Sequence, residues 1–560
     1  ALALGNTNTT GVITLSGEDF NTGGAITFTG ASYTVANGST DLTIVTTNDA
    51  VDFNAGTVTV GNNAFNIDTD TTGGGAGANI TFDGKILGDT TQVSGSTVLS
   101  DLSFDAGAGT ATVTVTDIGY NGTSDVNEIN SVALTGGTIS TNGKINTHTL
   151  TTGDKGSVTI TGALSLAGNT TIETDTAASQ TLDGAISITS TTNATGSETL
   201  TINSGSGAVD FGGLIGGTDG LGTVAINTTA GASGNEATGT IAIAGIGSAD
   251  GSSEAGTDSG STFTAGNTNT ASITLDGDMY FTDGNTLFES ASGNKIINNQ
   301  STGAVTDFIT AADSIEFKGG TLYVKETGVS IATSNGAVTI NSIDGDHDET
   351  VTIDAGSGAV SVGRIGGTNA SGEGIKSVAI TSTHATGITL TGNITTSDTA
   401  DSDVTLTGKV VINGDVDIDT SAGTDGDITF TSTIVGADGT NDDLILDTGG
   451  GALTFHATTT IGAGDSPLST LDIAQGGGTV ALTIPQIGDA SDDGVSGVVR
   501  IGTATSTSVT MRDQIYRFGT GNVTITADTT GTIFSTTGNS TGDLAGGNFL
   551  ITGAAKVSNG

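Results

Sequence analysis

The sequence predicts an all-β chain folded as a right-handed parallel β-helix, a β-solenoid with irregular coil insertions, and three observations support that prediction. Its 560 residues include 91 glycines, only 2 prolines, and no cysteine or tryptophan. Apolar and polar residues alternate in short runs such as GGAITFTG and GNVTITAD, which is the period of a half-buried strand. A degenerate block also recurs along the chain, as stacked repeats require.

Composition argues against disorder and against one large globular core. The hydrophobic fraction is 34%, and those apolar residues lie in the alternating runs, whereas disordered chains are poor in such residues. Only 17 Phe and 5 Tyr are present, which suits the narrow interior of stacked strands. No run of about 18 apolar residues occurs, so no membrane span is expected.

The charge balance excludes some partners. The chain has 59 acidic and 13 basic residues and a formal net charge of −46, which repels nucleic acid and anionic membrane surfaces. Such a surface suits a solvated exterior, so we expect an extracellular or cell-surface location. The absence of cysteine removes disulfides and thiolate metal sites.

One eight-residue motif, apolar-x-apolar-[Asp/Asn]-x-Gly-x-Gly, occurs four times, beginning at Leu102, Leu200, Val351 and Leu444. We expect its Asp or Asn to cap a turn, because such side chains bond the backbone two residues on. The glycines then supply positive φ angles. A row of ligands is the alternative interpretation, which we favour less. The residues concerned are Asp105, Gly107, Gly109, Asn203, Gly205, Gly207, Asp354, Gly356, Gly358, Asp447, Gly449 and Gly451.

The spacing of the motif bears on domain organisation. Successive copies begin 98, 151 and 93 residues apart, which favours a solenoid with inserted or lost coils of about 20 to 30 residues over tandem β-sandwich domains, the alternative fold. We expect one continuous solenoid over residues 1–560. Its degenerate blocks fall near 67–140, 172–247, 331–394 and 418–483, followed by C-terminal coils at 484–560.

Two segments carry a family resemblance. Residues 418–455 (IDTSAGTDGDITFTSTIVGADGTNDDLILDTGGGALTF) and 198–228 (ETLTINSGSGAVDFGGLIGGTDGLGTVAINT) resemble large bacterial β-strand-repeat surface proteins, similar to filamentous-haemagglutinin-like and autotransporter-like adhesins. The resemblance implies a right-handed parallel β-helix on the cell surface, used for adhesion, cell contact or an outer coat.

Asp344, Asp346 and Asp348 form the densest acidic cluster. The D-x-D-x-D spacing is how calcium loops present oxygen ligands, and calcium is the one cofactor that the sequence suggests. The glycine and distal glutamate of an EF-hand are missing, so a solvated turn is the favoured alternative. Weaker clusters of the same kind are Asp398, Asp401 and Asp403, and Asp489, Asp492 and Asp493.

No catalytic residue is predicted. The histidines are scattered and lack metal-ligand spacing; they are His148, His347, His384 and His456. The glycine-rich IGGT turns lack the lysine and following helix of a phosphate-binding loop. Paired carboxylates are unavoidable among 59 acids, so they do not indicate an enzyme.

Residues 511–521 (MRDQIYRFGTG) differ from the background because Arg512, Tyr516, Arg517 and Phe518 lie within seven residues. They form either a docking patch, since Arg and Tyr are favoured interface anchors, or a widened coil with its aromatics inside.

The sequence therefore predicts a non-enzymatic structural or adhesive protein of a bacterial surface that forms a fibre, sheath or coat. Self-association end to end is expected because solenoid ends expose strand edges, and a surface polysaccharide or a neighbouring or host cell surface is a further candidate partner. The alternatives are a calcium-dependent surface-layer protein and a polysaccharide-binding or polysaccharide-degrading β-helix protein.

Overall fold

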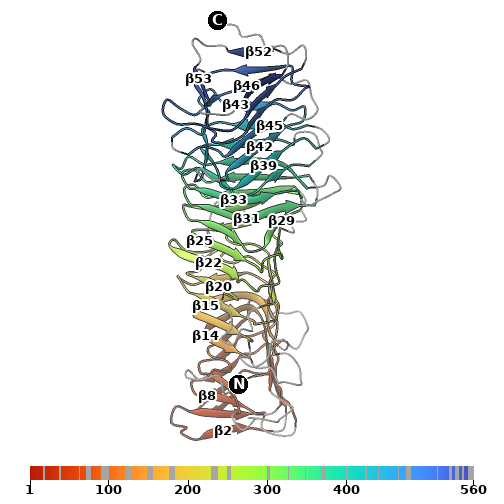
Figure 1. Ribbon diagram of the computed structural model, residues 1–560. Coiled ribbons are helices and arrows are strands. Elements are labelled where there is room, and N and C mark those ends of the chain that lie inside the picture. Colours follow the sequence, from red (N-terminus) through yellow and green to blue (C-terminus); the bar gives the residue numbers. More distant parts are fainter. Residues whose placement is uncertain are drawn as a thin grey trace. The chain divides into compact units, whose positions relative to one another are not determined.

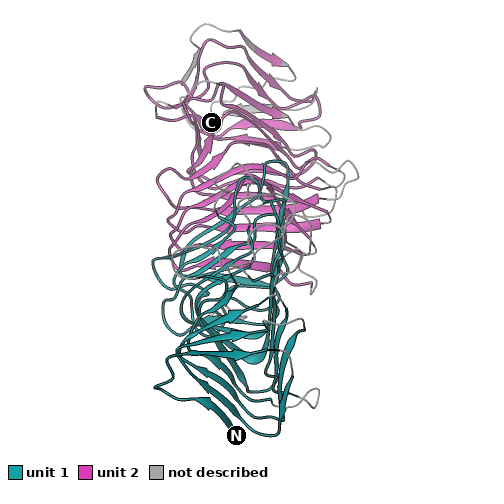
Figure 2. Cartoon of the chain, turned by 90° about the horizontal axis from the view of Figure 1, so that it is seen from below, with its two compact units in different colours: residues 1–296 teal, residues 297–560 magenta. Residues whose placement is uncertain are grey.

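The computed structural model describes residues 1–552 with several gaps. The residues that it does not describe within this range are 17–18, 37–39, 62, 71–76, 90–99, 121–128, 148–155, 176–182, 229–237, 249–253, 299–302, 326, 347, 368–373, 398–401, 423–424, 439–440, 465, 475–480, 514, 529–531, 536–540 and 545–547. The chain divides into two compact units, Ala1–Ile296 and Ile297–Gly560 (Figure 2).

Every regular element in the described residues is a β-strand. Unit 1 contains β1 (Leu2–Gly5), β2 (Val12–Leu15), β3 (Phe20–Thr22), β4 (Ile26–Thr29), β5 (Ser32–Val35), β6 (Leu42–Thr46), β7 (Val51–Asn54), β8 (Thr57–Val60), β9 (Phe65–Asp68), β10 (Ile80–Phe82), β11 (Ile86–Gly88), β12 (Asp101–Asp105), β13 (Thr112–Val115), β14 (Ser131–Asn146), β15 (Val158–Glu173), β16 (Ile186–Ile188), β17 (Thr192–Ala194), β18 (Leu200–Asn203), β19 (Val209–Phe211), β20 (Val224–Ile226), β21 (Thr240–Ile243), β22 (Ser261–Gly266), β23 (Ser272–Leu275), β24 (Met279–Thr282) and β25 (Gly284–Glu289).

The remaining strands are β26 (Lys295–Asn298), at the boundary, and those of unit 2: β27 (Thr306–Thr310), β28 (Ile315–Lys318), β29 (Thr321–Val324), β30 (Gly328–Ala332), β31 (Val338–Gly345), β32 (Asp348–Asp354), β33 (Val360–Ile365), β34 (Gly374–Thr381), β35 (Ile388–Leu390), β36 (Ile394–Thr395), β37 (Val404–Thr407), β38 (Val410–Ile412), β39 (Asp415–Asp419), β40 (Ile428–Phe430), β41 (Ile434–Gly436), β42 (Asp443–Asp447), β43 (Leu453–Phe455), β44 (Thr460–Ile461), β45 (Thr470–Ala474), β46 (Ala481–Ile484), β47 (Gln486–Ile487), β48 (Val499–Ile501), β49 (Ser508–Met511), β50 (Ile515–Phe518), β51 (Val523–Thr526), β52 (Thr532–Ser535), β53 (Thr541–Leu544) and β54 (Phe549–Thr552).

Within unit 1 the first coils stack as three rows of parallel strands. The rows are β1–β4–β7–β10–β13, β2–β5–β8–β11 and β3–β6–β9–β12. The long strands β14 and β15 pair with each other along most of their length (Figure 1) and bend through two corners, near Thr135 to Thr138 and near Thr141 to Gly143. Gly143 and Gly162 have φ angles of 143° and 126°, a range that favours glycine and allows these bends.

Unit 2 has the same plan. Its rows are β27–β30–β32–β34–β37–β40–β43, then β28–β31–β33–β35–β38–β41–β44–β47–β50–β53, and third β36–β39–β42–β45–β48–β51–β54. The strand pairings within these rows are parallel. Parallel stacking of successive coils confirms the predicted β-solenoid and excludes tandem sandwiches, whose sheets are antiparallel.

Strand register gives the coil length. In unit 2 the aligned residues Val351, Val378, Val404, Ile428 and Leu453 are 27, 26, 24 and 25 residues apart. In unit 1 Ile26, Val51, Ile80 and Val113 are 25, 29 and 33 apart. The longer separations correspond to inserted residues between strands. A single solenoid running through all 560 residues stays a prediction, because the two units are described separately.

The alternating sequence places its apolar residues inside the coils. In β4 (ITFT) Ile26 and Phe28 are buried and the two threonines are half-buried, and β8 and β37 follow the same rule. β-branched residues suit both faces, because they pack well on a pleated surface. In the described residues, no helix has the length and apolar character needed to cross a membrane.

Large side chains in the core of unit 1 are concentrated in its first coils. Phe28, Phe53 and Phe82 occupy the same position in β4, β7 and β10. Their rings stack with centroids 4.3 Å and 4.7 Å apart, and Phe65 and Phe104 of the third row pack beside them. Stacking of identical residues from coil to coil is possible only because the register is parallel and regular here.

Candidate functional site

The four copies of the glycine motif lie where β12, β18, β32 and β42 end. In three copies the predicted turn geometry is present: the amides of Gly107, Gly356 and Gly449 donate to Oδ1 of Asp105, Asp354 and Asp447, at 2.8, 3.0 and 2.9 Å. In the fourth, the Asn203 side chain lies beside the Asp175 carboxyl group. The φ angles of Gly107, Gly205, Gly356 and Gly449 are 75°, 55°, 54° and 54°.

The second glycine of each motif is required for a different reason. A Cβ on Gly207, Gly358 or Gly451 would lie 2.0, 1.9 or 2.2 Å from the backbone oxygen of Gly184, Gly336 or Gly426 in the preceding coil. In the first copy the relation is reversed, since a Cβ on Gly137 would lie 1.8 Å from the oxygen of Gly109. These glycines therefore lie at corners where the backbones of neighbouring coils approach closely.

The motif residues do not form a continuous line across coils. Asp105 lies in the third row of unit 1, whereas Asn203 lies on β18, in the stack β15–β18–β20. In unit 2 Asp354 lies in the first row and Asp447 in the third. Each therefore serves its own turn, an arrangement that suits capping.

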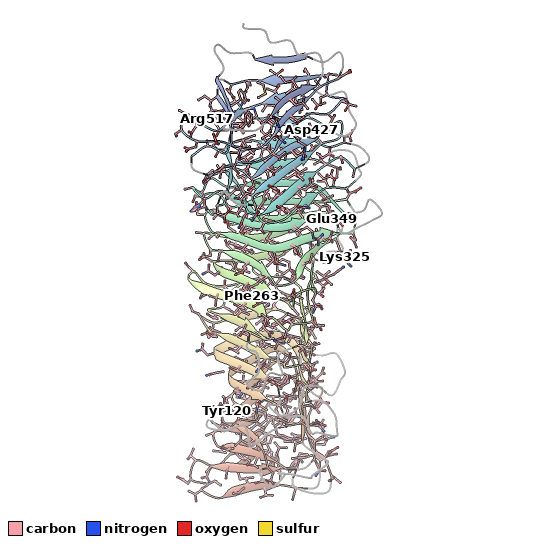
Figure 3. All side chains as sticks on the ribbon, in the orientation of Figure 1. Tyr120, Phe263, Lys325, Glu349, Asp427 and Arg517 are labelled. Carbon is pink, nitrogen blue, oxygen red and sulfur yellow. The ribbon has the colours of Figure 1, made fainter. Side chains whose placement is uncertain are left out.

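Many other Asp and Asn side chains connect one coil to the next. Oδ1 of Asp403 accepts the Asp427 amide at 2.8 Å, and Oδ1 of Asp427, labelled in Figure 3, accepts the Ala452 amide at 2.6 Å. The same bond joins Asn79 to Thr112, Asn169 to Thr199 and Asn393 to Asp417. These bonds satisfy the backbone amide just before, or within, a strand of the neighbouring coil, so part of the acidic composition is structural.

Asp344, Asp346 and Asp348 lie at the end of β31 and the start of β32. Asp344 is 6% exposed, with Oδ2 3.8 Å from Nη1 of Arg364, and Asp348 accepts a hydrogen bond from Ser397 at 3.1 Å. Glu349 beside them is fully buried and accepts the Asp346 amide at 3.3 Å. Among the described residues, no group of three or more Asp, Glu or His side chains is arranged to hold a metal ion, so calcium binding here stays a prediction.

Of the two weaker acidic clusters, the one at Asp489 is a local turn. The Asp489 carboxylate accepts the amides of Ser491 and Asp492, at 2.8 and 2.9 Å, and the Ser491 hydroxyl. These hydrogen bonds lower the pKa of this exposed carboxyl group to about 2. Asp398 and Asp401 lie outside the described residues.

Two of the four histidines can be placed. Nδ1 of His384 and of His456 lies 2.7 and 3.0 Å from the hydroxyl of Thr386 and of Thr458, each two residues on in the same turn. His148 and His347 lie outside the described residues.

The segment from Arg512 to Phe518 has its aromatic residues inside the coil, because Tyr516 and Phe518 are each 4% exposed. The two arginines bond carbonyl groups of other turns: Nη1 of Arg512 donates to Phe455 at 2.9 Å, and Nη1 of Arg517 donates to Ala490 at 2.7 Å. Arg517, labelled in Figure 3, also pairs with Asp493 at 3.6 Å. The geometry favours the widened-coil interpretation for the aromatic pair.

Three tyrosines form a repeated corner that the sequence did not reveal. In each, the hydroxyl accepts the amide three residues earlier: Gly30 to Tyr33, Gly277 to Tyr280 and Asp513 to Tyr516, at 2.7, 2.9 and 2.8 Å. Each hydroxyl also donates to a buried carbonyl, of Phe28, Ile243 or Ile484. Burial raises the pKa of all three phenols. The one shared sequence signal is a tyrosine at or just inside a strand start.

Replacing Tyr516 by phenylalanine is expected to lower the free energy of unfolding by about 1 to 3 kcal/mol, because the Asp513 amide and the Ile484 carbonyl lose their partner in a buried site. Urea denaturation followed by circular dichroism measures the change. Tyr120→Phe is the matched control, since the Tyr120 ring contacts Lys144 at 4.8 Å and phenylalanine keeps the ring. Equal losses in the two variants would contradict the role of the corner hydroxyl.

Lysines and carboxylates alternate in a row beside Tyr120 on unit 1. Lys85 pairs with Asp117 at 3.0 Å and Lys144 with Glu173 at 2.5 Å, and the amino group of Lys144 lies above the Tyr120 ring. The residues come from successive coils, since Ile86 aligns with Ile118 and Ile118 with Ile145. These contacts connect neighbouring coils, as the Asp and Asn hydrogen bonds do.

Comparison of the chain with family models, curated proteins and solved structures found no match. The fold itself defines the class of protein: a repeat protein that forms a parallel β-solenoid. Its polar side chains described above are mainly engaged in turns and in bonds between coils.

Proposed function

We propose that the chain is a non-enzymatic structural or adhesive protein of a bacterial surface, which builds a fibre, sheath or coat by stacking coils of one copy on those of another. The observation that carries this proposal is that the coils stack through parallel rows of strands, which a coil of another copy can extend. The hydrogen bonds that polar side chains form between neighbouring coils support the proposal, because they hold the coils together in solvent. The extracellular location rests on the acidic composition and on the family resemblance.

The first described coil of unit 1 is paired on one of its two sides. In the described residues β1, β2 and β3 pair only with β4, β5 and β6. Leu2 and Val12 on this coil are 38% and 60% exposed. A strand that is paired on one side offers its other edge as a template for another strand, and exposed apolar side chains favour such a contact.

The last described coil of unit 2 is likewise paired on one of its two sides. Here β52, β53 and β54 pair only with β49, β50 and β51 among the described strands. Leu550 on β54 is 53% exposed. Of the four exposed large hydrophobic residues described, only Ile445 lies away from these two coils.

The direction of the strands determines how two copies would join. Because every row is parallel, a second copy extends the rows in register only when its last coil meets the first coil of the next. The strands match in length, since β1 and β2 have four residues each and so do β52 and β53. A head-to-tail contact of this kind is heterologous and propagates as a filament.

Electron microscopy and sedimentation of the purified 560-residue chain over a concentration series test the proposal. We expect filaments for the wild type and loss of filaments for Val12→Lys, which puts a charge on the open edge. Ile445→Lys is the matched control, because Ile445 is an exposed hydrophobic residue on a strand paired on both sides, with β39 and β45. Dispersed monomers for the wild type, or filaments of Val12→Lys as abundant as those of the wild type, would reject it.

A further inference from the structure

Carboxylates of three neighbouring strands crowd the outer face of the third row of unit 2. Asp415 aligns with Asp443 and Asp419 with Asp447 between β39 and β42. Asp472 on β45 aligns with Ile445, which in turn aligns with Asp417. Like charges placed directly opposite each other destabilise a strand pair. The carboxylates of this face therefore weaken the pairing between its coils.

Three carboxylates of this face have a donor that stabilises their charge. Oδ1 of Asp419 accepts the amide and the hydroxyl of Ser421, at 2.8 and 2.6 Å. Asp447 accepts the Gly449 amide, and Asp472 accepts Nη1 of Arg500 at 3.1 Å. Donors of this kind favour the ionised form.

Asp417 differs from its neighbours. It is half-buried, and its Oδ1 atom is buried with no hydrogen-bond partner among the described residues. Burial, followed by the charges of Asp419, Asp447 and Asp472, raises the pKa of Asp417 above its ordinary value of 3.8. The buried oxygen is therefore a place where a proton is held more tightly in the folded chain than in the unfolded one.

The neighbours of Asp417 lie on β39 itself and on the strands to either side of it. On one side β36 contributes only Ile394 and Thr395, and Asn393 before it accepts the Asp417 amide at 3.0 Å. On β39 itself the titratable neighbours are Asp415 and Asp419. From the other side come the charged groups of β42, β45 and β48, which are Asp443, Asp447, Asp472 and Arg500. Of the nearby cations, Arg500 pairs with Asp472, and Arg364, on the strand β33 beyond β36, pairs with Asp344.

We propose that this face is a proton-responsive joint between the coils of β39, β42 and β45, in which Asp417 is the group that takes up the proton. Acidification protonates the Asp417 carboxylate. This removes one of the negative charges that repel one another on this face. The coils then hold together more tightly.

The direction in which pH changes stability follows from the linkage between protonation and folding. Because the folded pKa is raised, ionised Asp417 destabilises the folded state at neutral pH. That penalty disappears as the pH falls through the folded value towards 3.8, below which both states are protonated. Local stability therefore rises on mild acidification, the opposite of the usual carboxylate whose pKa is lowered by a partner.

Hydrogen–deuterium exchange of the full chain, corrected for the intrinsic pH dependence of exchange, measures this at about pH 7.5 and about pH 5. We expect protection of the amides in β39, β42 and β45 to increase at the lower pH, by up to about tenfold for each unit of raised pKa. Asp417→Asn should show the higher protection at both pH values. Asp415→Asn removes the same charge from an exposed position on the same strand and should keep the pH-dependent increase.

Three results would overturn the proposal: no increase in the wild type, loss of the increase in Asp415→Asn as complete as in Asp417→Asn, or lower protection of Asp417→Asn at both pH values. The last would mean that the charge of Asp417 stabilises the joint. None of these outcomes depends on filament formation, so the joint and the proposed function are tested separately.

Discussion

Replacing Phe53 by alanine is expected to cause the largest loss of stability in unit 1, about 3 to 5 kcal/mol from the lost burial and the cavity. Phe53 is 1% exposed and lies between two stacked rings, with centroids 4.3 Å from Phe28 and 4.7 Å from Phe82. It also meets Tyr33 and Phe65 edge-on, at 5.3 and 6.1 Å. Each such ring pair adds about 0.5 to 1.5 kcal/mol beyond its buried area.

The loss should be local as well as large. A repeat array is stabilised by contacts between neighbouring coils, so hydrogen exchange should accelerate first in β4, β7 and β10. Urea denaturation gives the free energy of unfolding for the same variant.

Asp52→Asn is the matched control for Phe53→Ala. Asp52 is the preceding residue on β7 and points outward, and burial together with the charge of Asp83 raises its pKa. Its neutral isostere should therefore be neutral or slightly stabilising at pH 7, within about 0.5 kcal/mol. A loss below about 1 kcal/mol for Phe53→Ala would show that the stacked rings are not the centre of this core.

Replacing Gly358 by alanine is expected to separate two coils of unit 2. The added Cβ would lie 1.9 Å from the oxygen of Gly336 and 2.4 Å from its carbonyl carbon. Both are backbone atoms, so no side chain can move aside. Overpacking of this kind costs about 1 to 3 kcal/mol or more, and faster exchange in β31 and β33, which flank these glycines, should accompany the loss.

Gly23→Ala is the matched control for Gly358→Ala, because a Cβ on Gly23 would meet no atom within 4 Å. Restricting the unfolded chain there should leave stability unchanged or raise it by about 0.4 to 1 kcal/mol. If Gly358→Ala unfolds at the same urea concentration as Gly23→Ala, the close approach of the coils is not what requires the second glycine of the motif.

Local chemistry was readable from the sequence wherever the cause lies within a few residues. Alternation in runs such as ITFT places Ile26 and Phe28 inward without reference to any other coil. The turn at Asp354 and Gly356 is equally local, since acceptor and donor are two residues apart. These short-range rules are why the all-β repeat architecture and the motif turns were predicted.

Features that depend on which coils are neighbours were decided by the tertiary structure alone. The second glycine, Gly358, is required by Gly336, 22 residues earlier, and the Tyr516 corner is closed by Ile484, 32 residues earlier. Separations between aligned residues vary from 24 to 33 in the stretches measured above. Because any alternating apolar strand can stack on any other, sequence periodicity cannot say which ones do.

The same reason explains the fate of the candidate residues. The four motif copies share a positive φ angle at their first glycine, yet insertions of unequal length place them on different rows, so no ligand row forms from them. Conversely, Asp417 and Asp472 are 55 residues apart and lie on one face only because β39, β42 and β45 stack in register. By itself, the sequence determined the solenoid class, its turns and its acidity. Stacking of the coils decided which acidic side chains gather and which serve as turn caps, because the distances between coils are set by register and not by position along the chain.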